Sequence, residues 1–99
     1  MSVRIEIPKE EVVAFCRRNH IRKLAFFGSV LRDDFTPESD VDVLVEFEQG
    51  HVPGLAFITM QDELSQLLRR SVDLNTPACL SPYFRQEILS EAEVVYVTA

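Results

Sequence analysis

Two spacings of apolar residues alternate along this chain, one with the period of a helix and one with the period of a strand. Val12, Phe15 and Cys16 share one face of residues 8–20, where Pro8 is tolerated in the first turn. A longer amphipathic helix follows the turn cluster at 49–54, and its apolar positions are Phe57, Met60, Leu64, Leu67 and Leu68. Both stripes predict helices that pack one face on a core.

Strand-like segments separate these helices. Short apolar runs predict strands at 21–27, 71–76 and 94–97, and the segment 40–47 alternates strictly between two sides. One side of that segment carries Val41, Val43, Val45 and Phe47, and the other carries Asp40, Asp42, Leu44 and Glu46. The alternation is typical of a strand that buries one face.

Two shorter helices complete the predicted order. One is expected over 30–35, before Pro37, and one from Ser81-Pro82 to about Ala92, because serine caps helices and proline starts them. We interpret residues 1–99 as a single domain of the α/β (α+β) class, a small mixed β-sheet with helices mainly on one face.

Composition narrows the classes of function. The formal charge of −6 argues against direct nucleic-acid binding, because an acidic surface repels phosphate backbones. The sequence has no signal-like start and no run near the ~20 apolar residues that span a bilayer, so we expect a soluble, cytoplasmic protein without a membrane partner. A domain of 99 residues has modest stability alone, and a permanent protein partner would help it.

The cysteines and histidines give little indication of a metal or catalytic site. Cys16 and Cys79 lie far apart without a ligand motif, which favours ordinary reduced thiols. His20 ends a predicted helix and His51 lies in a turn, with no carboxylate or cysteine at ligand spacing, so a surface or capping role is favoured for both. Of the aromatic pair Tyr83 and Phe84, we expect Phe84 in the core.

Three carboxylates carry the strongest chemical signal. Asp40 and Asp42 are two residues apart on a strand, so their side chains point the same way about 6.6 Å apart. Val72 and Leu74 mark the buried side of the 71–76 strand and leave Asp73 on the other. If the strands are neighbours, the three acids converge and would suit one or two Mg²⁺ ions, since Mg²⁺ prefers oxygen ligands. The alternative is charged, solvent-facing residues on an edge strand.

Gly28-Ser29 supplies the complementary half of a nucleotide site. The pair follows a predicted strand and opens a predicted helix, and glycine lets the main chain approach a phosphate closely. Ser29 adds a hydroxyl for the β- and γ-phosphates. Arg32 either reaches the triphosphate or pairs with Asp33 or Asp34, and the sequence leaves both options open.

Three segments together resemble a known family: 27–32 (FGSVLR), 39–45 (SDVDVLV) and 72–74 (VDL). Gly-Ser, a spacer of this length, Asp-x-Asp and a later strand acid are the signature of minimal nucleotidyltransferases in the DNA polymerase β-like superfamily. The chain departs from many members at Asp33, where they carry glycine after the arginine.

The resemblance implies the DNA polymerase β-like nucleotidyltransferase fold. It also implies a Mg²⁺-dependent transfer of AMP from ATP to a hydroxyl, with release of pyrophosphate. It implies two Mg²⁺ ions on Asp40 and Asp42, with Asp73 completing the metal site and activating the acceptor, and a triphosphate on Gly28, Ser29 and Arg32. It further implies an antitoxin that adenylylates a tyrosine of a HEPN-type ribonuclease toxin in a hetero-oligomer.

Two other hypotheses remain at this stage. A non-catalytic module could neutralise its partner by covering it, with the nucleotide site vestigial or structural. Adenylylation of a small molecule such as an antibiotic is disfavoured, because the chain has no room for the second domain that would grip such an acceptor. Intact ligand residues favour the enzyme.

Overall fold

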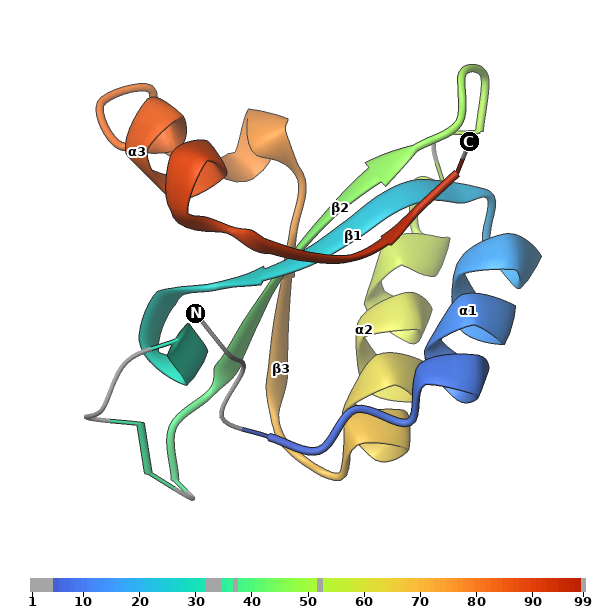
Figure 1. Cartoon of the computed structure of the whole chain (residues 1–99). Coiled ribbons are helices and arrows are strands. Elements are labelled where there is room, and N and C mark those ends of the chain that lie inside the picture. Colours follow the sequence, from blue (N-terminus) through green and yellow to red (C-terminus); the bar gives the residue numbers. More distant parts are fainter. Residues whose placement is uncertain (1–4, 32–34, 37, 52, 99) are drawn as a thin grey trace.

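A single mixed sheet organises the computed structural model, which describes residues 5–31, 35–36, 38–51 and 53–98. Its strands lie in the order β3-β2-β1-β4 (Figure 1), with bounds β1 Ile21–Phe27, β2 Val41–Phe47, β3 Val72–Asn75 and β4 Glu93–Val97. Strand β1 runs antiparallel to β2 and β4, whereas β2 and β3 are parallel. The predicted strands and mixed sheet are confirmed.

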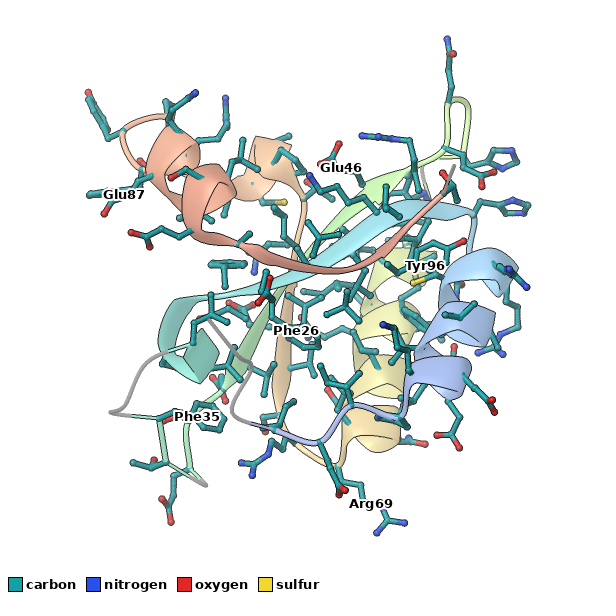
Figure 2. All side chains as sticks on the ribbon, viewed as in Figure 1. Phe26, Phe35, Glu46, Arg69, Glu87 and Tyr96 are labelled. Atoms are coloured by element: carbon teal, nitrogen blue, oxygen red, sulfur yellow. The ribbon has the colours of Figure 1, made fainter. Side chains whose placement is uncertain are left out.

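Two helices cover one face of this sheet, α1 (Lys9–Arg18) and α2 (Ala56–Leu68), as Figure 1 shows. Phe26 and Tyr96 point toward that side (Figure 2). The main core lies between the layers and includes the apolar stripes of both helices: Val12, Phe15 and Cys16 from α1, and Met60, Leu64 and Leu68 from α2. None of the helices in the described ranges has the length and apolarity needed to cross a membrane.

The opposite face carries a smaller apolar cluster, which the sequence pattern did not predict. Leu44, placed by the alternation on the side of the aspartates, is only 2% exposed and packs with Phe27 and Leu80. Helix α3 (Arg85–Glu91) contributes Ile88 to this cluster and lies on the side of the sheet away from α1 and α2 (Figure 1). The helices are mainly on one face, but the face of the aspartates is not fully uncovered.

The two short helices differ from their expected bounds. A 3₁₀ helix, η1 (Gly28–Leu31), begins at the glycine itself, Phe35 is not helical, and residues 32–34 lie outside the described part of the chain. Before α3, the Ser81 carbonyl accepts the Arg85 N–H at 2.9 Å and closes a turn over 82–84. Phe84 lies in this turn and is 58% exposed, so the expectation that it is in the core was wrong.

Two polar side chains of α2 hold the edge strand β3. Ser65 Oγ accepts the Val72 N–H at 3.1 Å, and Gln61 Oε1 accepts the Leu74 N–H at 2.9 Å. An edge strand presents unpaired N–H groups. These two bonds pair the N–H groups of the residues directly before and after Asp73. Helix α2 therefore fixes the position of Asp73 through the main chain.

Replacing Gln61 with methionine keeps the bulk of the side chain and removes the acceptor for the Leu74 N–H. An unpaired, part-buried N–H costs about 1–3 kcal/mol, so we expect Gln61→Met to lower the free energy of unfolding by that amount in urea titration. Gln66→Met is the matched control, because Gln66 is exposed on the same helix. Equal losses in the two variants would contradict this role of Gln61.

Candidate functional site

The parallel pairing of β2 and β3 brings two of the three predicted acids side by side. Asp42 and Asp73 are direct partners in the register, so their side chains leave the same face of the sheet. Asp42 is half-buried and Asp73 is exposed. Asp40 is exposed and directly precedes the first residue of β2. The expected strand alignment is confirmed, while the chemical role of the three carboxylates stays a prediction.

Gly28 lies against the carboxylate of Asp42. A Cβ placed on Gly28 would overlap with Asp42 Oδ2, closer than any ordinary contact. Gly28 also has a φ of +76°, a left-handed conformation that glycine adopts without strain. Because Phe27 pairs with Asp42 across the strands, the chain turns at Gly28 directly beside that acid.

The core anchors the turn that carries Ser29. Ser29 is half-buried in η1, and the next two residues, Val30 and Leu31, are buried in the main core. The predicted contact of a Gly-Ser turn with the Asp-x-Asp strand is therefore present in the fold. Arg32, the third predicted nucleotide-binding residue, lies outside the described residues.

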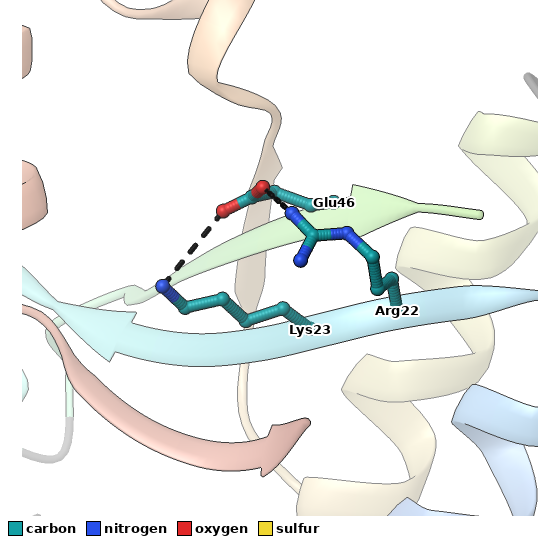
Figure 3. A network of polar contacts seen from close by, with 3 residues as sticks. All are labelled: Arg22, Lys23 and Glu46. Atoms are coloured by element: carbon teal, nitrogen blue, oxygen red, sulfur yellow. Dashed lines mark hydrogen bonds and ion pairs between the residues drawn. The ribbon is translucent and has the colours of Figure 1, made fainter. Parts of the chain in front are cut away.

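Glu46 is a fourth carboxylate, on the same face of β2 as Asp42, and two cationic side chains pair with it. Glu46 forms an ion pair with Arg22, and its Oε2 lies 3.9 Å from Lys23 Nζ (Figure 3). The β1–β2 register shifts between Ile21 and Lys23, which lets two consecutive cations reach one acid. Glu46 is thus part of the strand pairing and stands apart from the candidate site.

The pKa values of the two cysteine thiols are shifted in opposite directions by their surroundings. Burial in the core raises the pKa of Cys16 to about 12. The pKa of Cys79 is lowered, mainly because Thr76 Oγ1 donates to its Sγ at 3.3 Å and the Thr76 main chain adds a second bond. Burial and the negative charge of the Asp73 carboxylate act against this shift, because each raises the pKa of Cys79.

This arrangement can hold a divalent cation next to a phosphate. Carboxylate oxygens from adjacent strands are the ligands that Mg²⁺ prefers, and a glycine turn admits a phosphate to the main chain. Sequence reasoning missed Gln61 and Ser65, which position β3. Their signal was weak, since two polar residues four apart on a helix are usually a solvated face.

The chain is similar to proteins of one family. The family profile described as "Nucleotidyltransferase domain" matches residues 9–95. The protein adenylyltransferase MntA of Thermococcus cleftensis is 38% identical over 78 residues, which cover 78% of this chain and 75% of that protein. A candidate protein adenylyltransferase of Methanocaldococcus jannaschii is 33% identical over 79 residues, covering 78% of this chain and 77% of the relative.

Solved structures share the fold. One described as a candidate minimal nucleotidyltransferase is 34% identical, with a TM-score of 0.70 and 85% of both chains covered. A toxin–antitoxin crystal structure with AMP-PNP has a TM-score of 0.74 at 19% identity, covering 93% of this chain and 75% of that one. A complex of a tri-AMPylated Shewanella oneidensis HEPN toxin with its MNT antitoxin has a TM-score of 0.65 at 20% identity, covering 91% and 70%.

Substituting Gly28 with alanine tests the contact with Asp42. We expect Gly28→Ala to lose more stability than Gly54→Ala, measured as the free energy of unfolding in urea. Gly54 has a φ of +61°, and, apart from its two chain neighbours, no described residue has an atom within 4 Å of the position that its Cβ would take. The Gly54 variant therefore carries only the left-handed strain of about 1–2 kcal/mol. Equal losses would mean that Asp42 does not occupy the space beside Gly28.

Alkylation should separate the two thiols. At pH 8 we expect iodoacetamide to modify Cys79 quickly, because a lowered pKa leaves more thiolate, and to leave Cys16 unmodified until the protein is unfolded. Peptide mass spectrometry after timed quenching measures both sites. Thr76→Val should slow the reaction of Cys79, since it removes the hydroxyl donor, and an unchanged rate would contradict that cause.

Proposed function

Because the chain belongs to the nucleotidyltransferase domain family, we propose that it is a protein adenylyltransferase that moves AMP from ATP onto a tyrosine of a HEPN-type toxin and so acts as an antitoxin. One observation carries the proposal. The Asp42 carboxylate lies between its register partner Asp73 and the turn at Gly28. This position places the proposed metal ligands next to the proposed phosphate-binding turn.

The relatives support the acceptor class and the partner. Two curated relatives are named as protein adenylyltransferases, and the solved complexes pair this fold with a toxin, in one case tri-AMPylated. By analogy, we expect this chain to form a hetero-oligomer with its partner, in the cytoplasm where ATP is available.

The donor set fits magnesium. Asp40, Asp42 and Asp73 offer only carboxylate oxygens, two of them on directly paired positions, and Asp40 and Asp73 are exposed enough to share an ion with a substrate. We propose that Asp40 and Asp42 hold two Mg²⁺ ions and that Asp73 completes the site. When bound, the ions would supply charge stabilisation for the entering and leaving oxygens.

The turn at residues 28–29 receives the triphosphate. Gly28 lets the main chain turn beside Asp42, and the Ser29 hydroxyl and N–H are suited to donate to the β- and γ-phosphate oxygens. Arg32 comes next in the sequence after η1, and we propose that its guanidinium neutralises the triphosphate.

The acceptor hydroxyl loses its proton to Asp73 in the proposed reaction. Its oxygen then bonds to the α-phosphorus, the bond from that phosphorus to the oxygen bridging the β-phosphate breaks, and pyrophosphate leaves with the electron pair. Asp73 is exposed on the edge strand β3, so a tyrosine of another protein can reach it.

Replacing Asp42 with asparagine tests the proposal directly. A candidate HEPN-type toxin from a neighbouring reading frame is incubated with ATP, Mg²⁺ and the protein, and its intact mass is measured over time. We expect a gain of one or more AMP with the wild type. With Asp42→Asn we expect a rate loss larger than the ~10²-fold that removal of an outer-shell partner causes, because a ligand is lost.

Glu46→Gln is the matched control for this assay. It removes a carboxylate from the same face of the same strand, yet Glu46 pairs with Arg22 and Lys23 and takes no part in the proposed site. Its rate should stay near that of the wild type. Full neutralisation of the toxin by both the wild type and Asp42→Asn, with no adduct in either case, would overturn the proposal and favour a binding module.

A further inference from the structure

Three side chains of types that can bind a metal gather at the end of β2 away from the aspartates. His20, Glu48 and His51 each offer a ligand atom, and these atoms all lie within 4.8 Å of one another. Glu48 follows the last residue of β2, about 20 Å from Asp42 at ~3.3 Å per residue. From sequence spacing we expected a surface or capping role for both histidines; they are exposed, but the fold brings the Glu48 carboxylate beside them, because a backbone contact joins His20 to a distant segment.

The main chain holds these residues in place by itself. The Glu48 N–H donates to the His20 carbonyl at 2.9 Å, and the His51 N–H donates to the Glu48 carbonyl at 3.0 Å. His20, the second residue after α1, has a left-handed φ of 57°, and Gly50 has a φ of +83° within the turn. The three Cα positions are therefore set by backbone hydrogen bonds before any ion arrives.

The side chains lie close together and remain accessible. His20 Nδ1 is 3.7 Å from Glu48 Oε1, and the two imidazole rings stack with centroids 3.9 Å apart and planes 14° apart. The side chains of His20 and Glu48 are 53% and 43% exposed. Imidazole lone pairs lie in the ring plane, so one stacked ring must turn to face a shared ion, and its exposure permits that rotation.

We propose that His20, Glu48 and His51 form a second cation site, specific for a divalent transition metal of the zinc class. Zinc binds imidazole nitrogen and carboxylate oxygen at about 2.0–2.2 Å, whereas Mg²⁺ prefers oxygen ligands alone. Three protein ligands leave a fourth position for water. A bound ion would tie the α1–β1 junction to the turn between β2 and α2, independently of the proposed AMP transfer.

Calorimetric titration of the untagged protein with Zn²⁺ alone tests this site. We expect one Zn²⁺ per chain, and at least about tenfold weaker binding in His51→Ala and in His20→Asn. Asparagine is chosen at residue 20 because it tolerates the left-handed conformation. Cys79→Ser and Asp42→Asn are the controls, since each removes a competing ligand elsewhere, and both should bind Zn²⁺ as the wild type does.

Thermal melting gives a second reading that detects misfolded variants. Without metal, His51→Ala should melt near the wild-type temperature, because the side chain of His51 is exposed. With Zn²⁺, only the wild type and the two controls should show a raised melting temperature, as a ligand that binds the folded state stabilises it. Unchanged Zn²⁺ affinity in both histidine variants, or loss of binding in Cys79→Ser, would overturn the proposal.

Discussion

The carboxylate of Asp42 fills the space that a side chain at residue 28 would need, and the rest of the candidate site is arranged around this contact. It requires a glycine at the end of β1, a turn that departs at once from the strand, and an acid at the paired position of β2. Each requirement alone is common. Together they place a main-chain turn suited to phosphate directly beside a carboxylate suited to a cation, without any long side chain that must be ordered first.

The core fixes this contact from the other side of the sheet. Val41 and Val43 flank Asp42 on β2, and both are fully buried under α1 and α2, so a shift of one residue in register would expose them. On the neighbouring strand, hydrogen bonds from Gln61 and Ser65 of α2 hold the amides on either side of Asp73. The positions of both acids therefore depend on apolar packing and on edge-strand pairing that lie outside the site.

Most of the sheet could be predicted because its signals are local. Strict alternation over 40–47 identified β2 and the side of Asp42, and the flanking Val72 and Leu74 did the same for Asp73. The position of α3 could not be predicted, since Leu44 has the same sequence signal whether water or a helix covers it. Phe84 was misplaced for a related reason, because the turn closed by Ser81 delays the helix and puts that aromatic ring outside the cluster. His20 joins Glu48 and His51 through a backbone hydrogen bond between distant segments, which no sequence spacing reveals.

Strand β2 separates two kinds of ligand chemistry. Its first residues carry acids that offer oxygen alone, and its far end meets two imidazoles, which suit softer cations. Between them on the same face lie Leu44, buried under α3, and Glu46, paired with two cations. A buried apolar residue followed by a neutralised acid offers no intermediate position for an ion. The two proposed sites are thus separated by the side chains that lie between them on this face of the strand.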